Sequence, residues 1–309
     1  MSTNDITKLP RHDCARAPGK LILSGEHSVV YGAPALATAV NQYTDVWFTP
    51  VDSAQGLRTA FENLSPGQFY PLEILKSFKK GLDRRFDAFK RGDLTVKDIL
   101  QRPDDLALYA IAFLITHHIP MPGMRSKRRL PLPGVLRSKS TLPMGAGMGS
   151  SAAVIAATYV LFEHLLGKDH NSEKRFEHVR FCERLQHGYG SAIDAATVVH
   201  GGMIRVEGEQ VDRLKERDAA DFMARGGWYW VMTGQPDVST GECVAKVSEN
   251  HADDTQLWDA FAACTNALQD ALEGYVDPSA AIKENNRLLR HIGVVPDATN
   301  EIIHAIETA

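Results

Sequence analysis

The pattern of hydrophobic and polar positions divides this chain into strand-like and helix-like segments. Leu21–Leu23 and Ala35–Phe48 are rich in Val, Leu, Thr and aromatic residues, which predicts two early strands. Residues 58–118 carry densely spaced apolar positions and are expected to be mostly helical. Val135–Leu142 predicts a further strand. The first half of the chain therefore combines strands with helices.

The second half of the chain is mainly helical by the same criterion. Ser150–Leu166 predicts an apolar helix that ends at Gly167, and a second helix is expected over Ser172–His187. Trp228–Thr233 predicts a strand. Gln256–Leu272 predicts another helix, because its apolar positions recur every three or four residues. These positions are Leu257, Phe261, Cys264, Leu268 and Leu272.

Composition narrows the class of protein. The 309 residues are 44% hydrophobic and 23% charged with a net charge of −4, which is typical of a soluble globular chain without an overall attraction to nucleic acid. The four cysteines show no CxxC spacing, so reduced thiols are favoured over a zinc site or disulfide framework. The polar N-terminus lacks an apolar secretory segment, and the apolar runs are too short to cross a bilayer. We expect a cytoplasmic protein with neither a nucleic-acid nor a membrane partner.

A glycine-rich segment, Leu142–Ala153, precedes the first of these helices. Gly145, Gly147 and Gly149 alternate there, and Ser150 and Ser151 follow at the helix start. Glycines allow backbone N–H groups to approach a ligand, and a helix N-terminus favours an anion. The segment has neither the Gly-Lys-Ser/Thr of a Walker A loop nor the glycine spacing of a dinucleotide-binding fingerprint. A phosphate site and a tight strand-to-helix turn both remain open on this spacing.

A carboxylate lies at the edge of an apolar helix face. On the predicted helix Ser172–His187, the helical angle of Glu183 falls between those of Val179 and Phe176, and His187 follows one turn later. A charged group at this position needs a partner, either a basic side chain or a metal or substrate. Magnesium is a suitable metal because it takes few carboxylates together with phosphate oxygens and water.

A second acidic residue, Asp194, follows a turn of small residues. It either caps the next segment or accepts a substrate hydroxyl proton in phosphoryl transfer. Near the N-terminus, Lys20 is the natural partner for such an aspartate or for a transferred phosphate.

Together these motifs resemble the GHMP small-molecule kinases, and among them the mevalonate kinases most closely. The matching segments are ARAPGKLILSGEHSVVYG at Ala15–Gly32, LPMGAGMGSSAA at Leu142–Ala153, Glu183 with His187-Gly188, Ser191 and Asp194, and Thr233-Gly234 with Ser239-Thr240 and Val244–Val247. They occur in the family's order and cover most of residues 15–247.

The resemblance implies a two-domain α+β fold with ATP and acceptor meeting between the domains. The N-terminal domain, 1–224, would be of the ribosomal protein S5 domain 2-like type, and the C-terminal domain, 225–309, would be ferredoxin-like. It also implies that the chain phosphorylates mevalonate to 5-phosphomevalonate in isoprenoid precursor synthesis, with ATP and Mg²⁺, and that a homodimer forms.

The resemblance further implies a role for each matched residue. Asp194 is expected to be the catalytic base, and Lys20 to lower its pKa and stabilise the transferred group. Glu26, His27 and Ser191, with Lys20, would contact the acceptor, and Ser151 and Glu183 would hold magnesium. The ATP phosphates would be bound by Pro143, Gly145, Ala146, Gly147, Met148, Gly149, Ser150 and Ser151.

Two departures from the family pattern bear on function. The turn before Asp194 reads Gly190-Ser191-Ala192 where mevalonate kinases usually have Pro-Ser-Gly, and Gly190-Ser191 is similar to phosphomevalonate kinases. Family members also end with a third glycine-rich motif and closing strands, whereas nothing glycine-rich follows Gly293 here. The C-terminal domain is therefore expected to be incomplete and the activity weakened.

Three alternative functions stay open at this stage. A phosphomevalonate kinase is one, and the basic run Arg125–Arg129 would support it by contacting a phosphorylated acceptor, although a solvated loop is the more common explanation of such a run. Another GHMP sugar or metabolite kinase is the second. A catalytically silent metabolite sensor of the same fold is the third, but a sensor would not require Lys20, Glu183 and Asp194 together.

Overall fold

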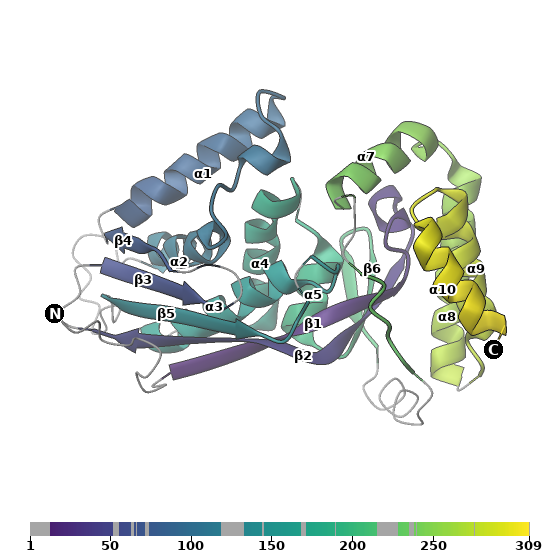
Figure 1. The fold of residues 1–309 in the computed structure, drawn as a ribbon, viewed down its shortest axis with the longest axis horizontal. Helices are drawn as coiled ribbons and strands as arrows, with labels where there is room; N and C mark the ends of the chain where they lie inside the picture. Colours follow the sequence, from purple (N-terminus) through teal and green to yellow (C-terminus); the bar gives the residue numbers. More distant parts are fainter. Residues whose placement is uncertain are drawn as a thin grey trace. The chain divides into compact units, whose positions relative to one another are not determined.

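A computed structural model describes residues 13–51, 56–62, 65, 67–71, 74–118, 133–143, 145–167, 171–188, 190–214, 228–234, 238, 240–274 and 276–308. The basic run Arg125–Arg129 and Ser239 lie outside these ranges. The chain divides into two compact units, each described by itself below (Figure 1). Unit 1 comprises Met1–Gly19, Asn41–Leu142 and Gly149–Val199, and unit 2 comprises Lys20–Val40, Pro143–Met148 and His200–Ala309.

Unit 1 contains a mixed sheet. The later half of β2 pairs antiparallel with β5, with Trp47 opposite Arg137, and β5 pairs in parallel with β3. β4 adds to β3 in antiparallel orientation. The bounds are β1 Asp13–Ser24, β2 Ala35–Pro50, β3 Gly56–Phe61, β4 Phe69–Pro71 and β5 Gly134–Ser140.

The helices of unit 1 cover this sheet. Figure 1 shows α1, α2 and α4 on one side of β3 and β5. α3 packs against α2 and α4, and the rings of Phe162 on α3 and Phe48 on β2 lie 5.7 Å apart. The bounds are α1 Leu75–Lys90, η4 Val96–Asp98, α2 Asp105–His118, α3 Ser150–Leu166, α4 Ser172–His187 and α5 Ala192–His200.

The predicted helices around the glycine-rich segment are confirmed. α3 and α4 have the predicted bounds, and their C-caps Gly167 and Gly188 adopt the left-handed conformation, with φ of 62° and 80°. The expectation that 58–118 is mostly helical is confirmed by α1, η4 and α2, although the start of this range holds β3 and β4, which were not predicted. Leu57, Thr59 and Phe61 are buried while Arg58 is exposed, and this period of two is that of a strand.

Unit 2 combines the first half of β2 with two short strands and four later helices. β6 pairs antiparallel with both β2 and β7. The bounds are η2 Ser28–Tyr31, β6 Met203–Glu207, β7 Gln210–Arg213, α7 Thr240–His251, α8 Thr255–Gly274, α9 Ser279–His291 and α10 Asp297–Thr308. α8 confirms the helix predicted over Gln256–Leu272.

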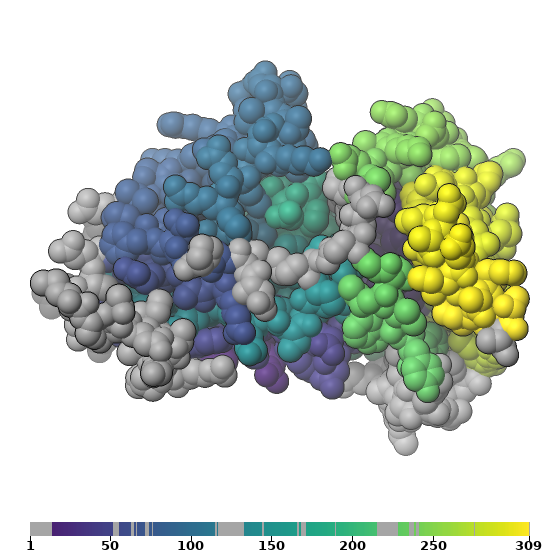
Figure 2. All heavy atoms as spheres, viewed as in Figure 1, coloured from purple at the N-terminus to yellow at the C-terminus, as the bar shows by residue number. Residues whose placement is uncertain are grey.

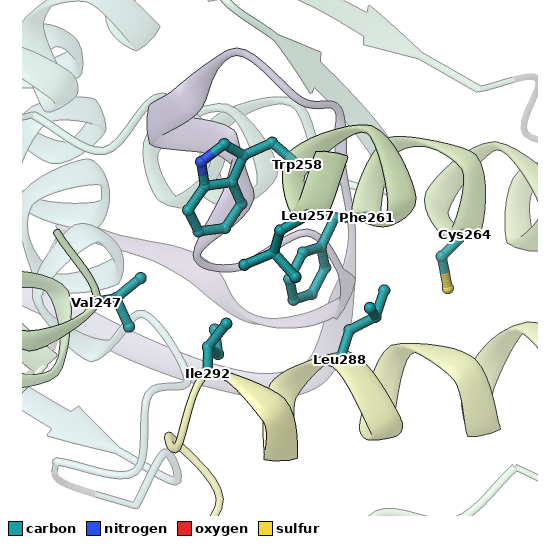
Figure 3. Packing of buried hydrophobic residues seen from close by; sticks show 7 residues of the cluster. All are labelled: Val247, Leu257, Trp258, Phe261, Cys264, Leu288 and Ile292. Atoms are coloured by element: carbon teal, nitrogen blue, oxygen red, sulfur yellow. The ribbon is translucent and has the colours of Figure 1, made fainter. Parts of the chain in front are cut away.

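The core of unit 2 lies between α8 and α9. In Figure 3, Phe261 of α8 faces Leu288 of α9 and Ile292, which directly follows α9; Val247 of α7 belongs to the same cluster. Trp258 stacks on Tyr31 of η2 with ring centroids 4.1 Å apart. This contact fixes η2, and with it the turn that follows β1, against α8.

The prediction of a strand at Trp228–Thr233 is wrong, because these residues form no strand in the structure. Tyr229 is 90% exposed, and none of the described strand pairings includes this segment. An apolar sequence becomes a strand only when a neighbouring strand supplies its hydrogen bonds.

Figure 2 shows α10 in yellow on the surface, and none of its residues is buried. Within the described ranges, no helix has both the length and the hydropathy needed to cross a membrane.

Candidate active site

The glycine-rich segment connects β5 to α3 through three left-handed residues. Gly145, Gly147 and Gly149 have φ of 72°, 70° and 69°, a conformation that costs L-residues about 1–2 kcal/mol each. Gly149 is also the N-cap of α3, where its carbonyl accepts from Ala153. The loop thus presents successive backbone N–H groups beside the positive end of a long helix, which suits an anion.

A backbone hydrogen bond joins this loop to β1. The N–H of Lys20 donates to the carbonyl of Met148 at 3.0 Å. Lys20 is only 5% exposed and Met148 is buried. The bond places a lysine ammonium group within side-chain reach of the loop, so a phosphate held by the loop would meet a positive charge.

A tight turn after β1 orients two further candidates. Gly25 has φ of 88°, and a Cβ there would lie 2.4 Å from the Pro34 carbonyl oxygen, so only glycine fits. Glu26 and His27 follow this turn. Burial raises the pKa of the Glu26 carboxyl, while the Lys20 charge opposes that shift. Burial lowers the pKa of His27, which favours the neutral imidazole.

α3 and α4 of unit 1 pack against each other in antiparallel orientation. Arg175 of α4 donates to Glu163 of α3 at 2.6 Å. About one turn further along the two helices, Tyr159 of α3 forms a hydrogen bond with His178 of α4. Continuing this antiparallel register puts Ser151 opposite the last turn of α4. That turn carries Glu183, which is fully buried, and His187, whose Nε2 lies 3.6 Å from Glu183 Oε2.

The donor set of Ser151 and Glu183 fits magnesium better than a transition metal. No group of three or more His, Cys, Asp and Glu side chains with metal-binding geometry occurs in the part of the chain that the structure describes. One hydroxyl and one carboxylate are the few hard oxygen ligands that magnesium accepts when phosphate and water supply the rest.

The turn from α4 to α5 is shaped by two glycines. A Cβ at Gly188 would lie 2.7 Å from the Phe89 ring, and one at Gly190 would lie 2.2 Å from the Arg180 carbonyl oxygen. The Gly190 carbonyl accepts from Arg180 Nε at 3.2 Å. The chain therefore returns closely along α4 before α5 begins.

Ser191, rather than Asp194, caps α5. Its Oγ accepts from the Asp194 N–H at 3.3 Å, the bond of an N-cap serine to the third helical residue. Asp194 lies in the first turn of α5, where the helix dipole stabilises a carboxylate. Asp194 is therefore not the N-cap residue of α5.

The predicted site residues divide between the two units. Unit 2 holds Lys20, Glu26, His27, Pro143 and the loop residues Gly145–Met148, and unit 1 holds Gly149–Ser151, Glu183, Ser191 and Asp194. Within unit 2, Lys20 lies next to both Met148 and Glu26.

Sequence reasoning missed a buried polar group behind Glu26. It consists of Ser24, Thr265 and Asn285. The available signal was Asn285, a polar residue at the same helical face as Ala281 and Leu288.

The chain is similar to several known proteins. The family model of the GHMP kinases N terminal domain matches residues 108–202. Human mevalonate kinase is 30% identical over 235 residues, which span 67% of this chain but only 57% of the human enzyme. Mevalonate kinase of Pyrococcus abyssi is 26% identical, with 97% of this chain and 84% of that enzyme aligned. The crystal structure of Methanococcus jannaschii mevalonate kinase superposes with a TM-score of 0.73 at 17% identity, covering 96% of this chain and 84% of that one.

Proposed function

Since this chain belongs to the GHMP kinase superfamily and is most similar to the mevalonate kinases, we propose that it phosphorylates mevalonate with ATP. The product is 5-phosphomevalonate, an intermediate of isoprenoid precursor synthesis. The observation that carries the proposal is the 3.0 Å bond from Lys20 to Met148, because it brings a buried lysine to an anion-binding loop.

The ATP phosphates are bound by Pro143 and Gly145–Ser151 in this proposal. This binding is supported by the run of left-handed glycines ending at the N-terminus of α3. Ser151 and Glu183 would hold Mg²⁺, which would neutralise phosphate charge when bound.

The acceptor hydroxyl reacts with the γ-phosphorus of ATP. The new bond joins the acceptor oxygen to phosphorus, the bond to the ADP oxygen breaks, and Asp194 takes the hydroxyl proton. Lys20 stabilises negative charge on the transferred group. Glu26, His27 and Ser191 position the acceptor.

We further propose a cytoplasmic homodimer. The location is supported by the cysteine spacing and the dimer by the resemblance to mevalonate kinases. Cell fractionation tests the location, and light scattering of the purified chain tests the dimer.

The activity test measures ADP release by the purified chain with ATP and Mg²⁺. Mevalonate, phosphomevalonate and galactose are compared as acceptors, with and without a chelator. Asp194→Asn removes the proposed base, and Asp270→Asn, an exposed aspartate on α8, is the matched control. Turnover of mevalonate that is lost only in Asp194→Asn supports the proposal.

Other outcomes identify the alternatives. Preference for phosphomevalonate reassigns the acceptor, and preference for galactose points to a sugar kinase. ATP binding without turnover of any of the three acceptors would point to the silent sensor or to a kinase whose activity is weakened.

A further inference from the structure

The last turn of α4 is tied to two other helices of unit 1 through the side chain of Arg184. Only 14% of this side chain is exposed. Its Nη2 donates to Asp83 Oδ1 on α1 at 2.9 Å and to the Tyr109 hydroxyl on α2 at 3.1 Å. One guanidinium group therefore joins α4 to both α1 and α2.

Asp83 accepts two further hydrogen bonds. The Tyr109 hydroxyl donates to its Oδ1 at 2.6 Å, and Lys79 donates to its Oδ2 at 2.7 Å. Burial opposes the charge of Asp83, but the bonds from Lys79 and Tyr109 outweigh it and lower the pKa of the carboxyl. The carboxylate is therefore ionised at neutral pH and lies between two cations, Lys79 and Arg184.

Aromatic rings enclose the guanidinium group at the same point. The ring centroids of Phe181, Phe86 and Tyr109 lie 3.8, 4.5 and 5.6 Å from the guanidinium carbon of Arg184. These rings come from α4, α1 and α2, and the face of an aromatic ring attracts a guanidinium group. The ion pair of Asp83 with Arg184, enclosed in this way, is called the Asp83 anchor below.

α1 contacts the end of α4 at a second place. The N–H of Gly188, the C-cap of α4, donates to the Arg184 carbonyl at 2.9 Å. A Cβ at Gly188 would lie 2.7 Å from the Phe89 ring of α1. The side chain of Arg184 thus bonds to α1 while its carbonyl completes the cap, so the anchor and the cap act on the same turn.

That turn also carries Glu183, the neighbour of Arg184 in sequence. Glu183 is fully buried, and its Oε2 lies 3.6 Å from His187 Nε2. A buried side chain has little freedom to compensate for a shift of its own backbone. Magnesium requires nearly ideal octahedral geometry with oxygens at about 2.0–2.1 Å, so a metal contact at Glu183 would depend on where the turn is held.

We propose that Asp83 is a positioning residue: through Arg184 it holds the last turn of α4 so that the Glu183 carboxylate meets the magnesium ion bound with ATP. This role rests on the proposed function, in which Glu183 holds the metal. Asp83 itself touches neither metal nor reactant in this proposal.

The binding test compares Asp83→Asn with Asp87→Asn. Asp87 lies one turn further along α1 and pairs with Lys90 where both side chains are more than half exposed, so it is a matched control. Calorimetry measures the Kd for ATP with Mg²⁺ and with a chelator. Asp83→Asn keeps the shape but removes the charge, which predicts a rise of roughly five- to tenfold in the Kd with Mg²⁺. The Kd in chelator and both values for the control should stay unchanged.

Arg184→Gln removes the other charge of the anchor. It should reduce the effect of Mg²⁺ on ATP affinity by a similar factor. In this background Asp83→Asn should add less than twofold, because both changes break one contact. Arg184→Gln also keeps the test decisive if Asp83→Asn does not fold.

Hydrogen exchange provides a measurement without metal or nucleotide. We expect the Gly188 amide to exchange roughly tenfold faster in Asp83→Asn, because the turn that it caps opens more often. Residues 176–180 in the middle of α4 should exchange as in the wild type. A general loss of stability would instead accelerate both regions, and Asp87→Asn should accelerate neither.

The two measurements separate the two proposals. Exchange of Gly188 equal to that of the wild type, or an unchanged effect of Mg²⁺ on ATP affinity, would overturn the role of Asp83. Both changes in a protein that turns over no acceptor would support the role of Asp83 and reject the proposed function.

Discussion

The backbone N–H of Lys20 donates to the carbonyl of Met148 at 3.0 Å, joining the strand β1 to the glycine-rich loop. The bond uses the backbone alone, so it does not depend on which side chain stands at position 20. We expect substitution of Lys20 to change chemistry while preserving the loop.

Lys20→Met tests that expectation. It keeps the length and apolar stem of the side chain but removes the charge that would stabilise the transferred phosphoryl group. Loss of one such electrostatic contact predicts a fall in kcat of about 100- to 1,000-fold. Steady-state ADP release measures it, and Lys246→Met, at an exposed position of α7, is the control. A kcat within threefold of the wild type would argue against the assigned role of Lys20.

Gly147→Ala tests the loop. A Cβ at Gly147 meets open space, so only its φ of 70° opposes alanine, at a cost of about 1–2 kcal/mol. Gly92→Ala is matched to it, because Gly92 also has positive φ and open space but lies after α1. Both variants should lose similar thermal stability, and only Gly147→Ala should raise the KM for ATP. An equal KM in the two variants would remove the support for phosphate binding by the loop.

The stability of Glu26→Gln at different pH values tests whether the pKa of the Glu26 carboxyl is raised. Burial raises the pKa of Glu26 above its ordinary value of 4.5, so the native state keeps this proton to higher pH than the unfolded chain. The stability contributed by Glu26 is therefore complete below 4.5 and declines as pH rises toward the native pKa. A glutamine at position 26 does not titrate, so its contribution to stability does not change with pH. The Tm of Glu26→Gln minus that of the wild type should increase from pH 4 to pH 8 in thermal scans, and a constant difference would contradict the raised pKa.

Gly190→Ala tests the turn that delivers Ser191 and Asp194. The added Cβ would lie 2.2 Å from the Arg180 carbonyl oxygen, so the backbone must shift. We expect a loss of about 2 kcal/mol or more in the free energy of unfolding together with a lower kcat. Gly81→Ala, within α1 and facing open space, should instead stabilise the fold by about 0.5–1 kcal/mol. Denaturant titration of both variants measures these opposite signs.

The sequence by itself determined the elements whose causes are local. The bounds of α3 and α4 follow from apolar periodicity and from Gly167 and Gly188, which reach the left-handed conformation that ends a helix. The alternating glycines before α3 similarly specify a left-handed loop, because each backbone angle depends on its own residue.

Only the tertiary structure decided the features that depend on distant partners. The segment 56–61 is a strand because it pairs with β5, which lies more than seventy positions later, whereas Trp228–Thr233 pairs with none of the described strands. The bond of Lys20 to Met148 and the contacts of Ser24 with Thr265 and Asn285 likewise join remote segments. Short-range patterns encode a helix or a turn, but such contacts form only when the whole chain packs, and no local spacing specifies them.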